Sequence, residues 1–273
     1  MMRARQVLTE KTGERRMNGS VRAARALACA GVLVLSACGG GGDEGEDADA
    51  GGTAASPSES AASPSESAAN DFGCLAGKQL KKSTTFEDTE GNEVDGYETG
   101  TGTTGIVLSH QSNNDVCSWI PSADELAAAG YRVLAVNSNS SEIPEIEAAA
   151  ARLREDGARK VVLMGASKGG TASLVAASRI RPAVTAVVSL SGPGVYGDMD
   201  ATKAVPELTM PVYLLAASGD GRFADDARTL HKLAKKSHGE KLEMVAGAAH
   251  GSDILLQQPS VWDEVKNFIK NHG

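Results

Sequence analysis

Residues 160–180 have the sequence KVVLMGASKGGTASLVAASRI, and this stretch decides the fold of the 273-residue chain. Lys160–Gly165 is a short apolar run, typical of a strand that is buried on both faces of a sheet. Thr171–Ile180 is rich in alanine and ends before Pro182, which is typical of a helix. The stretch therefore predicts a strand, a sharp turn and a helix in direct succession.

The same alternation continues on both sides of this stretch. Further strands are expected at Gly105–Ser109, Arg132–Val136, Ala183–Leu190, Pro211–Ala217 and Lys241–Val245. Further helices are expected at Trp119–Ala129, Glu142–Glu155, Phe223–Lys236 and Pro259–Asn271. Upstream, Lys81–Glu87 and Glu93–Glu98 are expected to pair antiparallel at one edge. This order predicts an α/β domain whose central sheet is mostly parallel and is flanked by helices on both faces.

The turn between the Lys160–Gly165 strand and the Thr171–Ile180 helix contains the residues that indicate a chemical function. Gly165-Ala166-Ser167-Lys168-Gly169 fits the nucleophile-elbow pattern G-x-S-x-G. So short a motif is weak evidence in a chain with 31 glycines, but its place between a buried strand and a helix makes it specific. The glycines leave room for a strained turn, which should expose the serine at the helix amino terminus, where the dipole favours negative charge. We predict that Ser167 is a nucleophile.

A serine nucleophile needs a base and a group that orients the base. His250 lies in the small-residue loop Ala246–Gly251, after the last strand, and is the predicted base; the alternative is a loop histidine without a role. Asp220, just after the strand that ends at Ala217, is the predicted acid, and Asp198 or Asp200 is the alternative.

The chain order Ser, Asp, His is that of the α/β-hydrolases, and from Gly105 onward the chain resembles that superfamily. The likeness is to its small dienelactone-hydrolase and esterase-like serine hydrolases. The resemblance implies the α/β-hydrolase fold. It also implies a small-molecule ester substrate, an acyl-enzyme intermediate, no cofactor and no metal.

The resemblance also implies an oxyanion hole. In such proteins a His-Gly-x turn follows the strand before the first helix, and the turn here is His110-Gln111-Ser112, with Trp119 where relatives often carry an aromatic residue. The backbone N–H groups of Ser112 and Lys168 would then stabilise the oxyanion.

Three positions depart from the pattern of the superfamily. Gln111 replaces a glycine, and Asn137–Ser140 stands where relatives often have Asp-x-Arg-Gly. Lys168 replaces an apolar residue or glutamine. We expect the Lys168 side chain to be exposed; the alternatives are that it attracts acidic substrates or lowers the pKa of a neighbour.

Other functions use the same residues. An acyltransferase would need an acceptor better than water, and an amidase or peptidase usually needs further substrate-binding domains. A non-catalytic binding lipoprotein on the same fold would be free to lose any of Ser167, Asp220 and His250, so their joint presence favours an enzyme.

The substrate pocket is expected to be open. Cap domains often follow the strand that ends here at Leu190, yet only residues 191–210 separate it from the next strand. These residues include several glycines and prolines, which break regular structure. The sequence predicts no sizeable cap domain and a preference for short acyl chains.

The amino-terminal part has the features of an exported lipoprotein. Residues 1–37, starting at Met1 or Met17, form a predicted signal peptide whose apolar run is too short to span a bilayer. Leu35-Ser36-Ala37-Cys38 resembles a bacterial lipobox, so Cys38 is the predicted lipidation site and the protein should face outside the cytoplasm, anchored to the membrane.

Residues 38–70 form a predicted disordered tether, acidic at first and then with the repeated heptad AASPSES. Residues 71–273 remain for one α/β-hydrolase domain. The net charge of −8 does not support a nucleic-acid partner, since proteins that bind DNA or RNA are usually basic.

Two cysteines remain after Cys29 leaves with the signal peptide and Cys38 takes the lipid. Cys74 and Cys117 are predicted to form a disulfide outside the cytoplasm; the alternative is two separate buried thiols. Neither cysteine lies in a CxxC motif or beside clustered histidines, so no metal site is predicted.

We expect the protein made with its own signal to fractionate with membranes, and Cys38→Ala to release it or to block its processing. Membrane fractionation and the intact mass of the mature protein measure this. An amino terminus cut by signal peptidase and carrying no lipid mass would contradict the prediction.

Overall fold

An eight-stranded sheet organises the part of the chain that the computed structural model describes, residues 69–138 and 142–273. The signal peptide, Cys38 and nearly all of the predicted tether lie outside the described residues. The strands of the sheet are β1 (Ser83–Glu87), β2 (Glu93–Thr99), β3 (Thr104–Ser109), β4 (Arg132–Val136), β5 (Lys160–Ala166), β6 (Ala186–Leu190), β9 (Val212–Ala217) and β10 (Lys241–Val245).

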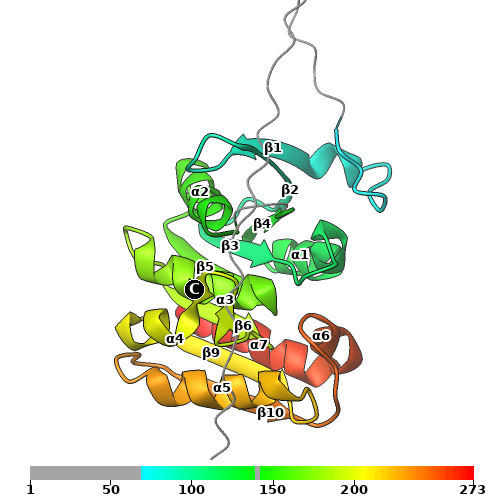
Figure 1. The fold of residues 1–273 in the computed structure, drawn as a ribbon. Coiled ribbons are helices and arrows are strands. Elements are labelled where there is room, and N and C mark those ends of the chain that lie inside the picture. Colours follow the sequence, from blue (N-terminus) through cyan, green and yellow to red (C-terminus); the bar gives the residue numbers. More distant parts are fainter. Residues whose placement is uncertain (1–68, 139–141) are drawn as a thin grey trace, which may run out of the picture. The chain divides into compact units, whose positions relative to one another are not determined.

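The strand order is β1-β2-β4-β3-β5-β6-β9-β10, and Figure 1 shows it running from β1 at one edge to β10 at the other. Strand β2 pairs antiparallel with both β1 and β4, whereas every pair from β4 to β10 is parallel. The predicted mostly parallel sheet with an antiparallel pair at one edge is therefore confirmed.

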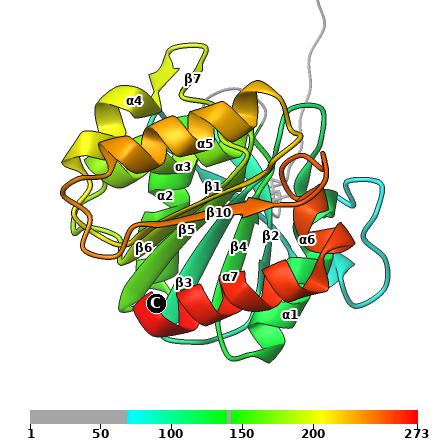
Figure 2. The same cartoon turned by 90° about the horizontal axis from the view of Figure 1, so that it is seen from below.

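Helices cover both faces of the sheet, as Figure 2 shows. The helices are α1 (Ile120–Ala128), α2 (Glu142–Glu155), α3 (Lys168–Arg179), α4 (Ala201–Ala204), α5 (Arg222–Leu233), α6 (Asp253–Gln257) and α7 (Pro259–His272). One apolar cluster joins the sheet to α2, α3, α4 and α5, and a second joins the opposite face to α1, α6 and α7. Of the helices in the described residues, none is both long and apolar enough to span a lipid bilayer.

Strand β5 shows why the buried strands are almost uniformly apolar. Val161 and Leu163 point into the first cluster, and Val162 and Met164 point into the second. All four side chains are fully buried, because successive residues of a strand face opposite sides and both sides carry helices. Burying each such side chain stabilises the fold by about 1.5–3 kcal/mol.

The segment between β6 and β9 contains no sizeable cap. It forms a hairpin of β7 (Val195–Tyr196) and β8 (Met199–Asp200), the single turn α4 and a 3₁₀ turn at Val205–Glu207. The prediction of no cap domain is confirmed, but the segment is more regular than its glycines and prolines suggested.

Two helices differ from expectation. Helix α3 begins at Lys168, directly after Ser167 and three residues before the predicted start at Thr171. Helix α6, only five residues long, was not predicted. The first turn of α3 contains Gly169 and Gly170, which locally disfavour a helix but are held in it by tertiary packing.

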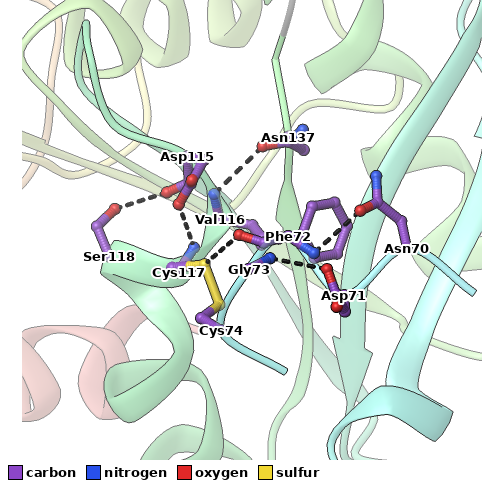
Figure 3. Close-up of a disulfide and its surroundings, with 10 residues drawn as sticks. All are labelled: Asn70, Asp71, Phe72, Gly73, Cys74, Asp115, Val116, Cys117, Ser118 and Asn137. Carbon is purple, nitrogen blue, oxygen red and sulfur yellow. Dashed lines mark hydrogen bonds between the residues drawn. A yellow bond between two sulfur atoms is a disulfide. The ribbon is translucent and has the colours of Figure 1, made fainter. Parts of the chain in front are cut away.

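Cys74 and Cys117 form a disulfide with an S–S distance of 2.01 Å and a Cα–Cα distance of 6.0 Å (Figure 3). Asp115 begins a 3₁₀ turn at Val116–Trp119 and accepts the Cys117 N–H at 2.9 Å. The Asn137 side-chain oxygen accepts the Val116 N–H at 3.3 Å. The disulfide thus ties the start of the described domain to the loop after β3.

We expect the mature exported protein to contain no free thiol under denaturing conditions. Cys74→Ser/Cys117→Ser should lower the free energy of unfolding by about 3–4 kcal/mol, because the disulfide restricts a loop of 44 residues in the unfolded chain. Alkylation with mass analysis and urea denaturation measure these effects, with reduced wild type as the control. Two alkylatable thiols per mature chain would contradict the pairing.

Candidate active site

Ser167 lies in a strained turn between β5 and α3. Its backbone has φ +48° and ψ −115°, a conformation that a non-glycine residue adopts only when the surroundings impose it. Its N–H donates to the Leu190 carbonyl at 2.8 Å, which links the turn to the end of β6. Strain of this kind at a serine is typical of a functional turn.

The two glycines of the motif are required by close backbone packing. A Cβ atom at Gly165 would lie 2.1 Å from the Gly169 carbonyl oxygen. A Cβ at Gly169 would lie 2.3 Å from the carbonyl oxygen of Ser109, the last residue of β3. The spacing G-x-S-x-G therefore follows from the approach of α3 to β5 and β3.

The structure brings His250 and Asp220 together. His250 Nδ1 lies 2.9 Å from Asp220 Oδ2 and 3.0 Å from Oδ1, although 30 residues separate them. A carboxylate only accepts, so Nδ1 carries the proton and Nε2 presents its lone pair. The Asp220 side chain is nearly buried, and the Phe223 ring packs on the imidazole with a centroid distance of 4.3 Å.

The two alternative acids lie in or beside the β7–β8 hairpin, away from His250. Asp200 caps α4 by accepting from the Lys203 N–H and from the Thr202 hydroxyl. The hydrogen bonds from Thr202 and Lys203 lower the pKa of Asp200 to about 2. Asp198 lies at the turn of the β7–β8 hairpin. Across residues 69–138 and 142–273, neither carboxylate hydrogen-bonds His250.

The loop of His250 packs against the turn of Ser167. A Cβ at Gly251 would lie 3.2 Å from the Ala166 Cβ, and the Gly251 N–H donates to the Ser191 hydroxyl at 3.0 Å. These contacts bring the loops after β6 and β10 to the elbow. Ser167 is only 6% exposed, so the expectation of an exposed serine is wrong: packed loops surround it.

The Ser167 hydroxyl makes no hydrogen bond within the described residues. Serine–base bonds are often long without substrate and tighten in the reacting complex. The structure therefore places the serine and the histidine in adjoining loops without a hydrogen bond between their side chains among the described residues.

His110 orients the backbone of the loop after β3. Its Nε2 accepts the Ser138 N–H at 3.0 Å, so Nδ1 carries the proton and donates to the Gln111 carbonyl at 2.9 Å. Burial lowers the pKa of His110, which keeps the ring neutral at pH 7. A trans peptide directs its C=O and N–H to opposite sides, so the Ser112 N–H points away from His110.

Ser112 has a further partner that the sequence did not indicate. Its hydroxyl lies 2.7 Å from the Tyr196 hydroxyl, across a separation of 84 residues. Tyr196 belongs to the β7–β8 hairpin, so this small hairpin reaches the predicted oxyanion loop. No local signal identified Tyr196, because its role depends on how the hairpin folds back.

Lys168 is not the exposed lysine that we expected. Its Nζ lies 2.5 Å from Glu142 Oε1, and the two side chains are only 13% and 16% exposed. The ion pair balances the lysine charge, so Lys168 is not a free cation for acidic substrates, but its charge adds to the effect of burial in lowering the pKa of His110. The segment Asn137–Ser140, which departs from the superfamily pattern, is described only in part, because residues 139 and 140 lie outside the described residues. The Asn137 side chain accepts the Val116 N–H, and the Ser138 N–H donates to the His110 ring.

Known proteins resemble this chain in fold. A protein from Butyrivibrio proteoclasticus matches 70% of the chain and 98% of its own length, with 16% identity and a TM-score of 0.58. An esterase from Pyrococcus furiosus matches 70% of the chain and 91% of its own, with 14% identity and a TM-score of 0.62. An esterase from a Rhodococcus species matches 70% and 100%, with 17% identity and a TM-score of 0.57.

A search of curated proteins found no match. The family model described as "Dienelactone hydrolase family" matches residues 122–258, which is half of the chain and includes Ser167, Asp220 and His250. The sheet order, the helical layers and this match agree. The chain therefore belongs to the dienelactone hydrolase family, whose members are ester hydrolases with the α/β-hydrolase fold.

Proposed function

We propose that this protein is a serine hydrolase that cleaves carboxylic esters through an acyl-enzyme. The observation that carries the proposal is the His250–Asp220 pair beside the strained turn of Ser167. A nucleophile, a base and an orienting carboxylate on three loops at one edge of a parallel sheet constitute a complete acyl-transfer apparatus.

The reaction follows from these positions. Ser167 Oγ attacks the ester carbonyl carbon while His250 Nε2 takes the hydroxyl proton, and the carbonyl oxygen becomes an oxyanion. His250 then returns the proton to the alkoxide leaving group, and the alcohol departs from the acyl-enzyme. Water, activated by the same imidazole, releases the carboxylic acid and restores Ser167. Asp220 keeps the proton on Nδ1 throughout and stabilises the imidazolium.

The oxyanion is stabilised by the backbone N–H groups of Ser112 and Lys168. Lys168 is the first residue of α3, where the helix dipole favours negative charge. His110 and Tyr196 support the loop of Ser112 from two sides. Each such donor lowers the barrier by about 3–4 kcal/mol in a comparable hydrolase.

The proposed reaction takes place outside the cytoplasm on a lipid-anchored protein. The lipobox at Cys38 and the signal peptide support export, and the disulfide between Cys74 and Cys117 is compatible with an oxidising compartment. The domain would then act on small esters near the membrane to which residues 38–70 tether it.

Ser167→Ala and His250→Ala should each reduce turnover of p-nitrophenyl acetate to near background, while Asp220→Asn should leave a measurable remnant. Each variant removes or disorients one member of the proton-transfer chain. Ser178→Ala is the matched control, because Ser178 lies in α3, which begins directly after Ser167, and its hydroxyl donates to the Val175 carbonyl. Full activity of Ser167→Ala would refute the mechanism, and full activity of Asp220→Asn would refute the role of Asp220 as the orienting acid.

The same variants give a direct test of the nucleophile. Wild type exposed to a fluorophosphonate should gain the mass of one phosphonyl group, and Ser167→Ala should gain none. A labelled Ser167→Ala protein would show that another residue reacts.

We expect esters of short acyl chains, roughly C2 to C6, to be the best substrates. A buried methylene contributes about 0.8 kcal/mol to binding only where apolar surface covers it, and the segment between β6 and β9 supplies no helical lid to do so. A series of p-nitrophenyl esters, with and without a lipid–water interface, measures the preference. A maximum at C12 or longer would contradict it.

A further inference from the structure

Gln111 connects two parts of the proposed active site that are far apart in sequence. Its side-chain oxygen accepts the Ser252 N–H at 3.1 Å and the Ser252 hydroxyl at 3.3 Å, across 141 residues. Gln111 directly precedes Ser112, the proposed oxyanion donor, and Ser252 lies two residues after His250. The two hydrogen bonds therefore join the oxyanion loop to the loop of the general base.

The contact is closely fitted as well as hydrogen-bonded. A Cβ at Gly251 would lie 2.0 Å from the side-chain oxygen of Gln111, so the amide rests on the backbone between His250 and Ser252. Gly251 also has φ +58°, a conformation that favours glycine. The course of the His250 loop and the placement of the Gln111 amide thus depend on each other.

The backbone of Gln111 is fixed at the same time. Its carbonyl accepts from the neutral, buried ring of His110, while its side chain binds the opposite loop. Gln111 is therefore held at both ends, and it transmits the placement of one loop to the other. A glycine at this position, as in related hydrolases, would keep the backbone contact and lose the connection to Ser252.

We propose that Gln111 is a positioning residue that holds the His250 loop against the oxyanion loop. It fixes the placement of the His250 imidazole relative to the Ser112 N–H while charge develops on the substrate. The role rests on the proposed function. A displacement of about 1 Å in such a constellation can reduce turnover about 100-fold while ground-state binding is retained, so the effect should fall on kcat.

The test is Gln111→Met, which keeps the length of the side chain and removes its acceptor. For p-nitrophenyl acetate we expect kcat to fall about 10- to 100-fold and KM to change less than about twofold. Gln79→Met is the matched control: Gln79 makes one side-chain hydrogen bond, to Asp124, and that variant should keep the wild-type kcat. Circular dichroism and thermal unfolding verify that each variant is folded.

Ser252→Ala tests the contact from its other side. It removes one of the two donors, so kcat should fall about two- to fivefold. Because both changes act on one contact, Gln111→Met/Ser252→Ala should be no slower than Gln111→Met alone. If Gln111→Met does not fold, the kcat and KM of Ser252→Ala decide.

The outcomes separate this inference from the proposed function. Full activity in Ser167→Ala overturns the proposed function. An inactive Ser167→Ala together with a wild-type kcat in Gln111→Met overturns only the positioning role. A loss confined to KM, or losses that add in the double variant, also overturn it.

Discussion

The close approach of α3 to the ends of β3 and β5 is the constraint on which the rest of the structure depends. Gly169 has no Cβ, so the helix backbone can pack against the Ser109 carbonyl. Gly165 also has no Cβ, which leaves room for the Gly169 carbonyl of the same helix. This approach forces Ser167 into its strained conformation. It also fixes the end of β3, from which His110 and the oxyanion loop begin. One backbone contact therefore places both the proposed nucleophile and the groups proposed to stabilise the oxyanion.

The sheet could be predicted because each buried strand is a local signal. Strands with helices on both faces consist almost wholly of apolar residues, as β5 does, and such runs are visible in sequence. The ends of helices were harder to predict from the sequence where tertiary contacts override the local preference of the residues. Gly169 and Gly170 disfavour helix formation locally. They nevertheless lie in α3, because a side chain at either position would collide with neighbouring atoms. Helix α6 has only five residues, too few to give a periodic pattern.

The predicted partners His250 and Asp220 meet, since both follow parallel strands whose carboxyl ends share one edge. The supporting contacts had no comparable signal. Tyr196 reaches Ser112 across 84 residues, and Gln111 reaches Ser252 across 141. Lys168 looked like a surface residue because Glu142, its partner, belongs to another helix. Sequence patterns therefore indicated the residues that we propose as catalytic, and only the folded chain identifies the residues that contact them.

The Cys74–Cys117 disulfide has a mechanical consequence. A load applied at the amino-terminal end of the described domain reaches Cys74 and passes through the covalent bridge to Cys117. Residues 75–116, which include β1, β2 and β3, lie within the closed loop and bear no tension along their backbone. An edge strand such as β1 would otherwise be the first element to peel from the sheet. The bridge allows the sheet to stay intact while the chain before it is stretched.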